Sequence, residues 1–216
     1  MPIDIRCDLR SSFGAARDQN PRPTCMAFAA SDAHAAARPG WEPLSAEWGY
    51  YHAVRREGCT PEDGATLPTM LKVLEQDGQP HEAGWPYIAA PMVNVAAWKP
   101  PLTVTPLFRR DGDLITVSVD EVIARLDAGT PVLLTMQLSD AFYTPDKEGI
   151  IDSAEKPDPK RRHAAVAAGH GIGGSGLMVL IRNSWGPLWG IDGYGWLTAS
   201  YLACRLLRAA ILTKEP

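Results

Sequence analysis

The chain changes character near its middle, and this change constrains the fold more than any other feature of the sequence. In the first half, three segments carry apolar side chains at the spacing of helices: residues 25–37, 45–56 and 68–76. Each is followed by a residue that commonly ends a helix, namely Gly40, Gly58 and Gly78. We therefore expect the first half to be helical.

The second half contains short runs of Val, Ile, Leu and Thr between Gly, Pro and Asp, the pattern of strands. The expected strands are residues 102–108, 114–117, 131–136, 163–166, 177–182 and 195–198. One short helix is expected after Ser118, which forms a capping-box pattern with Glu121. Residues 80–101, rich in Pro and Trp, are expected to cross between the halves, and residues 144–162 to form an exposed loop.

These segments predict a single α+β domain over residues 1–216. We expect a mainly helical lobe over residues 9–100 and a mainly β lobe over residues 101–216. Two lobes of this kind leave a natural cleft between them, where a site can form.

Charge and cysteine content exclude several classes of partner. Lys and Arg number 21 and Asp and Glu 25, so the net charge is −4, without the clustered basic face that binds nucleic acid. The N-terminus lacks the apolar run of a signal peptide, and no stretch is apolar enough to span a membrane. The four cysteines form no CxxC pair, so we expect free thiols and a cytoplasmic location.

Cys25 stands at the expected start of a helix, where unpaired backbone N–H groups lower the pKa of a thiol. A lone cysteine is more often a small buried residue, so a nucleophile also requires an imidazole, a group that orients it and donors to an oxyanion. Gln19 lies upstream and can supply such a donor beside the Cys25 backbone N–H. His163 begins one expected strand and Asn183 ends the next, so adjacent strands would place them side by side.

With these residues in order, the chain resembles the papain-like cysteine peptidases. The most specific stretch is the closing block Asn183-Ser-Trp-Gly-Pro-Leu-Trp-Gly-Ile-Asp-Gly-Tyr194. Asp18-Gln19, Cys25-Met-Ala-Phe-Ala29 and Gly84-Trp-Pro-Tyr87 also match family landmarks. The likeness begins at Asp8-Leu9-Arg10, covers nearly the whole chain, and is to bacterial-type members without a prosegment.

The resemblance implies a two-lobe fold with a helical left lobe, an antiparallel β-barrel-like right lobe and the active-site cleft between them. It implies four catalytic residues, Gln19, Cys25, His163 and Asn183, and three substrate-binding residues, Gly64, Ala65 and Trp185. Trp185 would shield the bond between Asn183 and His163 from water and line the leaving-group side. No metal and no cofactor are implied.

Three departures from the family pattern precede the nucleophile. Arg22 occupies the position of a cysteine that in the family is bridged to one near Cys59, so that disulfide cannot form. Pro23 removes a backbone donor from a loop that walls the family's pocket. Asn20 replaces a glycine and is among the residues that tolerate the left-handed conformation, so the turn can persist.

Other candidate motifs have a structural interpretation. Residues 169–174 match GxGxxG but precede an expected strand rather than a helix, so we predict a glycine-rich β turn with a packed or solvated His170. His34, His52 and His81 lack partners at metal-ligand spacing. The remaining cysteines are expected to be packed thiols, with a bond between Cys7 and Cys204 left open.

The expected activity is hydrolysis of peptide bonds, by an endopeptidase or exopeptidase, through an acyl-thioester on Cys25. The expected resting state is a Cys25 thiolate paired with a His163 imidazolium. Two alternatives stay open: an acyl transferase or deamidase acting on a specific protein, and a non-catalytic peptide-binding module. Few residues precede Asp8, so a separate inhibitor protein or a restricted substrate would control activity, unless the chain was cut from a longer one.

Overall fold

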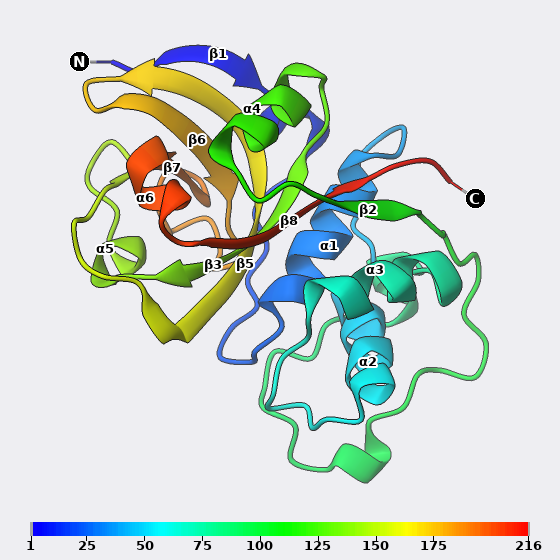
Figure 1. Ribbon diagram of the computed structural model, residues 1–216. Helices are drawn as coiled ribbons and strands as arrows, with labels where there is room; N and C mark the ends of the chain where they lie inside the picture. The colour runs from blue at the N-terminus through cyan, green and yellow to red at the C-terminus, as the bar shows by residue number, and fades with distance from the viewer. Residues whose placement is uncertain (1, 216) are drawn as a thin grey trace.

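Three helices gather on one side of the molecule and an eight-stranded sheet on the other in the computed structural model, which describes residues 2–215 (Figure 1). The helical elements are η1 (Arg10–Ser12), α1 (Cys25–Ala36), α2 (Ala46–Glu57), α3 (Leu67–Gln76), η2 (Glu82–Gly84), η3 (Val95–Ala97), α4 (Val119–Asp127), α5 (Asp140–Tyr143) and α6 (Ala199–Ala203). The α+β class expected from the sequence is confirmed.

The strands form one sheet in the order β2-β8-β3-β5-β6-β7-β4, and β1 pairs with β5. Their bounds are β1 (Asp4–Asp8), β2 (Gly112–Ile115), β3 (Val132–Leu138), β4 (Ile150–Ile151), β5 (Asp158–Gly173), β6 (Gly176–Arg182), β7 (Tyr194–Thr198) and β8 (Leu206–Leu212). The pairings are antiparallel except that of β4 with β7, which is parallel. The two strands that matter most for the site, β5 and β6, are neighbours.

The helix ends follow the local chemistry of the sequence. The Ser45 hydroxyl accepts a hydrogen bond from the Trp48 N–H at the start of α2, and Gly58 ends this helix in the left-handed conformation at φ 64°. The Ser118 hydroxyl caps α4 through the Glu121 N–H, as expected. The Glu121 carboxylate binds Arg125 instead of returning to the cap.

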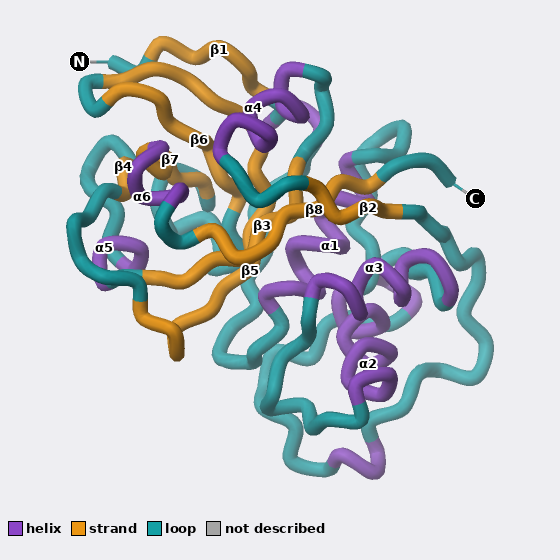
Figure 2. Tube along the Cα trace, viewed as in Figure 1, coloured by secondary structure: helices purple, strands orange, loops and turns teal. Residues whose placement is uncertain are grey.

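Helix α1 lies between the other two helices and the sheet, as Figure 2 shows. Its residues 26–35 are all buried, which explains why the helix is rich in alanine. Successive residues of β5 serve two cores: Ala164 and Val166 pack with the helices, while Ala165 and Ala167 pack in the core beneath α4 and α6. This packing fixes the start of α1 against β5.

Two segment predictions were wrong. Residues 102–108 form a loop rather than a strand, and only Phe108 pairs there, through an isolated bridge to Gln79. Pro106 cannot donate a ladder hydrogen bond, so a run rich in Val and Thr stays outside the sheet. Residues 144–162 are not one exposed loop, because they contain β4 and the first residues of β5.

The glycine-rich segment is mostly strand, since β5 continues to Gly173 and only the residues just after it turn into β6. No helix follows, so the dinucleotide-binding interpretation is excluded. A side chain at Gly169 would place its Cβ 2.5 Å from the Cys7 carbonyl oxygen, so the glycine permits β1 to pair closely with β5. Sequence patterns had not indicated β1 or β8.

Candidate active site

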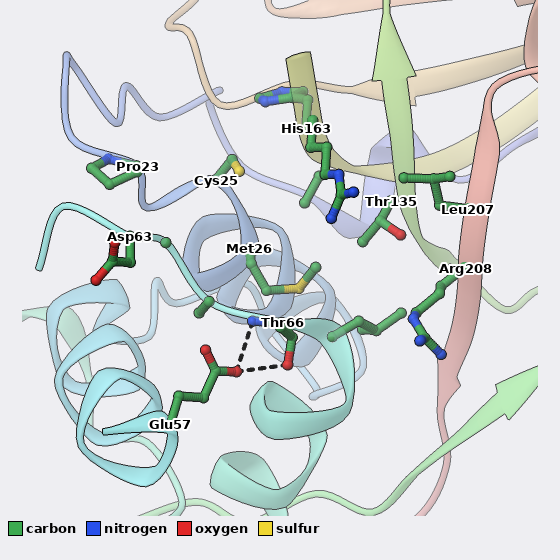
Figure 3. Close-up of a pocket in the computed structure, with 15 residues that line it drawn as sticks. Pro23, Cys25, Met26, Glu57, Asp63, Thr66, Thr135, His163, Leu207 and Arg208 are labelled. Carbon is green, nitrogen blue, oxygen red and sulfur yellow. Dashed lines mark hydrogen bonds between the residues drawn. The ribbon is translucent and has the colours of Figure 1, made fainter. Parts of the chain in front are cut away.

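Cys25 and His163 meet in a cavity where the two lobes face each other. Cys25 is the first residue of α1, and His163 lies on β5 and is 5% exposed. Both line a cavity of about 300 Å³, and Figure 3 shows the sulfur and the imidazole at the same end of it. The fold therefore brings together two residues that are far apart in the sequence.

Asn183 fixes the imidazole, as the pairing of β5 with β6 predicts. The His163 Nε2 lies 2.6 Å from the Asn183 Oδ1, and the Ser184 N–H donates to the same oxygen at 2.8 Å. An oxygen that accepts both bonds requires a hydrogen on Nε2. In the neutral ring, Nδ1 then carries the free lone pair, which is the arrangement that a general base needs.

Aromatic side chains enclose this pair of residues. The Trp185 ring lies 4.8 Å from the His163 ring and the Phe142 ring 5.4 Å, measured between centroids. Tyr143 stacks on Trp185 at 5.3 Å. Trp185 is not among the residues that line the 300 Å³ cavity, so its contact in this structure is with the histidine.

Burial acts on both groups of the candidate pair. It raises the pKa of the Cys25 thiol, while backbone N–H groups of Ala164, Met26 and Cys25 itself lower it. Burial lowers the pKa of His163 to about 4, against the opposing effect of the Asn183 hydrogen bond. Burial thus favours the uncharged thiol and imidazole, and the resting ion pair stays a prediction that depends on the mutual attraction of the two charges.

Gln19 is held by the residue next to Asn183. Its backbone N–H donates to the Ser184 carbonyl at 2.8 Å, and its Oε1 accepts from the Ser184 hydroxyl at 2.7 Å. Its Nε2 donates to the Arg22 carbonyl at 2.8 Å. The amide nitrogen has two hydrogens, so one is left for an oxyanion. Gln19 is 6% exposed and lies beneath the loop before Cys25 rather than in the cavity lining.

Gly64 and Ala65 line the cavity on the helical side, where the resemblance had placed the substrate-binding segment. Gly64 has φ +87°, a conformation that a side chain would strain. Asn20 adopts φ 52°, so the left-handed turn expected there is present.

A buried ion pair lies where the family disulfide would begin. Arg22 is 3% exposed and Glu47 is fully buried, and their side chains form two bonds of 2.6 and 3.0 Å. Glu47 also accepts from the Trp98 Nε1 at 2.6 Å and from the Ile88 N–H at 3.0 Å. The pair therefore ties the loop before Cys25 to α2 and to the crossing segment. All four cysteines are free, including Cys7 and Cys204.

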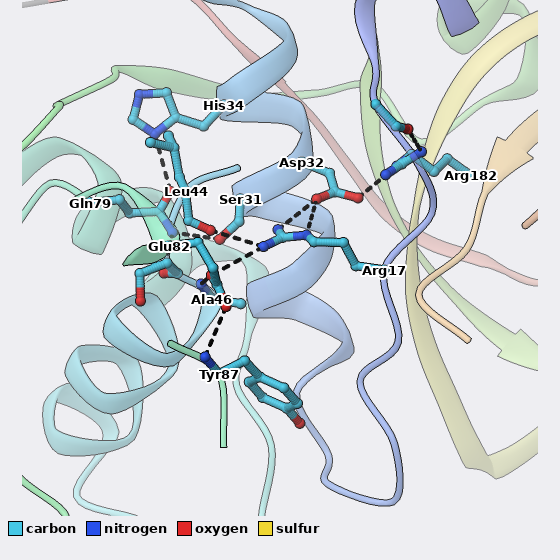
Figure 4. Close-up of polar contacts among 12 residues, drawn as sticks. Arg17, Ser31, Asp32, His34, Leu44, Ala46, Gln79, Glu82, Tyr87 and Arg182 are labelled. Atoms are coloured by element: carbon cyan, nitrogen blue, oxygen red, sulfur yellow. Dashed lines mark hydrogen bonds and ion pairs between the residues drawn. The ribbon is translucent and has the colours of Figure 1, made fainter. Parts of the chain in front are cut away.

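A second buried network joins the two lobes behind the site (Figure 4). Asp32 of α1 binds Arg17 at 2.6 Å and Arg182 at 2.6 Å through different oxygens. Arg182 directly precedes Asn183, and Arg17 lies two residues before Gln19. Sequence reasoning missed this network, although a single carboxylate in an alanine-rich helix is a signal that it needs a buried partner.

Two further histidines, His34 and His170, are packed inside the protein and lie outside the cavity lining. His170 is 6% exposed and its Nε2 lies 2.6 Å from Asp127, so it is a packed histidine. His34 contacts Gln79 at 3.1 Å inside the helical lobe. Within residues 2–215, no three His, Cys, Asp or Glu side chains group as a metal site would require. None of the helices described there is long and apolar enough to cross a bilayer.

Comparison with known sequences gives one family. The sequence model described as "Papain family cysteine protease" matches residues 3–213. Cysteine proteinase 3 of Entamoeba histolytica is 32% identical over 143 residues, which are 63% of this chain and 42% of that protein. Silicatein of Petrosia ficiformis is 34% identical over 64 residues, which are 30% of this chain and 19% of that protein. The aligned parts thus span less than half of each relative.

Solved structures share the fold at low sequence identity. Xylellain, a cysteine protease from Xylella fastidiosa, superposes with a TM-score of 0.79 and 20% identity, covering 100% of this chain and 88% of its own. The ragweed pollen cysteine protease Amb a 11, in its proform, gives a TM-score of 0.77 and 21% identity, covering 100% of this chain and 66% of its own. The two-lobe fold implied by the resemblance is confirmed.

Proposed function

Because the chain belongs to the papain family of cysteine proteases, we propose that it hydrolyses peptide bonds through a covalent intermediate on Cys25. The observation that best supports this proposal is the 2.6 Å contact between the His163 Nε2 and the Asn183 Oδ1. It leaves the other ring nitrogen free to act as a base in the cavity that Cys25 shares. Peptides or proteins are the proposed substrates.

Acylation starts from the proposed ion pair, in which the proton of the Cys25 thiol has already moved to the His163 Nδ1. The thiolate sulfur bonds to the carbonyl carbon of the substrate amide. The carbonyl π electrons move to the oxygen, which accepts hydrogen bonds from the Gln19 Nε2 and the Cys25 N–H. One such donor typically lowers the barrier by about 3 kcal/mol. The C–N bond then breaks as His163 returns the proton to the leaving amine.

Deacylation repeats these steps with water. The His163 Nδ1 removes a proton from a water molecule whose oxygen bonds to the thioester carbon. The C–S bond then breaks, and the proton taken from water stays on His163. The carboxyl product leaves, and the pair of Cys25 thiolate and His163 imidazolium is regenerated.

We also propose where the protein acts and how its peptidase activity is controlled. The four free thiols support a reducing, cytoplasmic setting. A separate inhibitor protein, or a restricted range of substrates, is the proposed means of control. The same residues can serve an endopeptidase or an exopeptidase.

Mass spectrometry of the products tests the proposal. With a mixture of unstructured peptides, we expect pairs of fragments whose summed mass exceeds that of the substrate by one water. Cys25→Ala should produce none, whereas the control Cys59→Ala should produce the same fragments, because Cys59 is a free thiol outside the cavity lining.

Three other results would contradict it. A new amide bond to an added amine would identify an acyl transferase, and conversion of a side-chain amide to an acid a deamidase. Peptide binding without any chemical change would identify a binding module.

A further inference from the structure

The cavity that contains Cys25 extends along the sheet to β8. Figure 3 shows Cys25 and His163 at one end and Arg208 at the other, with Met26 and Thr135 between them. The strand register explains this line of side chains: Thr135 on β3 pairs with Ala164 on one side and with Arg208 on the other. Paired residues share a face of the sheet, and Ala164 packs toward the helical lobe.

The walls of this end of the cavity are apolar. Met26 of α1, Leu67 of α3 and Leu207 of β8 line it. Such walls suit the methylene groups of a side chain that enters from the Cys25 end. The guanidinium of Arg208 and the hydroxyl of Thr135 are the polar groups that this side chain would meet.

The acidic residues of the lining are already bonded within the protein. The Glu57 Oε1 accepts from the Thr66 N–H at 3.0 Å and from its hydroxyl at 2.6 Å. The Asp63 Oδ2 accepts from the Thr60 N–H and hydroxyl, both at 2.8 Å, and these bonds lower the pKa of Asp63. Both carboxylates are thus held by neutral donors on the helical side, Asp63 within a tight turn and Glu57 across nine residues.

The arginines of the lining have no such partners. Within residues 2–215, neither Arg162 nor Arg208 forms an ion pair, and Arg162 makes a single long bond of 3.3 Å to the Pro159 carbonyl. The side of the cavity formed by the sheet therefore carries two arginines without an ion-pair partner, opposite the carboxylates of the helical side. Arginine in particular can bind a carboxylate through two parallel N–H bonds.

We propose that the end of this cavity at Arg208 selects an acidic side chain of the substrate, so that the enzyme prefers to cut near Glu or Asp. The inference rests on the proposed function, because it concerns the same cavity. Arg208 binds the carboxylate, Met26, Leu67 and Leu207 contact the methylene groups, and Arg162 disfavours a basic side chain.

Matched peptides test this preference. Pairs that differ only by Glu or Gln at one position near the scissile bond are compared by kcat/KM. We expect one position at which Glu is preferred by about tenfold or more. Added salt should reduce this ratio, because the site is exposed to solvent.

Variants of Arg208 test whether this residue causes the preference for Glu. Arg208→Gln should remove the Glu preference, and Arg208→Glu should replace it with a preference for Lys. The control Arg109→Gln changes an exposed arginine outside the cavity and should leave the Glu preference intact. Labelling of Cys25 by a small epoxide confirms that each variant is folded.

The outcomes separate this inference from the proposed function. Cleavage with no Glu preference, a preference for Lys in the unmodified protein, or an unchanged ratio in Arg208→Gln would overturn the inference and leave the proposed function standing. No cleavage of any peptide, with no labelling of Cys25, would overturn both.

Discussion

At the scale of single residues, two consecutive side chains control the whole candidate site. Asn183 holds the His163 ring and Ser184 holds the Gln19 amide, so one short segment after β6 orients both the proposed base and the proposed oxyanion donor. Such orienting contacts limit the motion of groups that must act within tenths of an ångström. The hydroxyl of Ser184 thereby acts as a positioning group.

Gln19 offers a direct test at this scale. Gln19→Ala should lower kcat by about 10²–10³ with little change in KM, because the lost donor acts on charge that forms only in the transition state. Gln19→Glu keeps the size and the acceptor for Ser184 but replaces the amide donor, so it should be similarly impaired. Steady-state kinetics on one peptide measures both. A Gln19→Glu enzyme as active as the unmodified one would refute the oxyanion role.

At the scale of elements, a buried ion pair holds the loop that leads into α1. Arg22 and Glu47 tie this loop to α2 and to the crossing segment, at the place where a disulfide is absent. A buried pair has little net effect on stability compared with apolar residues, but removing one partner leaves an uncompensated charge. The Arg22 carbonyl oxygen accepts the hydrogen bond of the Gln19 amide. The position of this oxygen therefore depends on Glu47, which holds the Arg22 side chain.

For this ion pair, we predict that Glu47→Gln destabilises the protein. The variant should unfold with a free energy lower by about 3–5 kcal/mol, because the Arg22 guanidinium stays buried without its counter-charge. Urea denaturation measures this difference.

Arg22→Met combined with Glu47→Leu is the matched control, since it removes both charges. It should be markedly more stable than Glu47→Gln alone. If the double variant were the less stable of the two, the charge explanation would be wrong.

Some features of the candidate site could be predicted from the sequence and others could not. The gathering of Cys25, His163, Asn183 and Gln19 could be expected, because the proposed chemistry demands these residue types and the strand order places two of them together. The partners of Arg22 and Asp32 were not predictable, since their ion pairs join segments with no common period. Residues 102–108 have the composition of a strand but form a loop. Pro106 lacks the N–H that would donate a hydrogen bond to a neighbouring strand.

At the scale of the whole molecule, His34 is a fully buried histidine in the helical lobe, outside the candidate site. Its Nδ1 contacts the Gln79 Oε1 at 3.1 Å. Burial lowers the pKa of His34 to about 4 from the ordinary value of 6.5. His34 therefore couples the stability of the fold to pH.

The contribution of His34 to stability should fall as the pH decreases from 6.5 toward 4. In this range the unfolded chain takes up a proton at His34 while the folded chain does not, so unfolding is favoured by acid. The loss from His34 should be about 2 kcal/mol between about pH 7 and about pH 5. Urea unfolding at the two pH values measures it.

His34→Gln serves as the comparison, because it removes this titrating group, which lies outside the cavity. Over the same interval its free energy of unfolding should fall by about 2 kcal/mol less than that of the unmodified protein. An identical pH dependence in the two proteins would show that His34 is not buried as a neutral group.

The proposed catalysis depends most on Cys25 as the one activated thiol, and labelling with a thiol-directed peptidyl epoxide followed by peptide mapping tests this directly. Cys204 is exposed whereas Cys25 is only partly exposed, so selective modification of Cys25 would report reactivity rather than access. We predict a single adduct on Cys25 that forms far more slowly in His163→Ala and is accompanied by loss of peptide hydrolysis. An adduct on Cys7, Cys59 or Cys204, with hydrolysis retained in Cys25→Ala, would contradict the account.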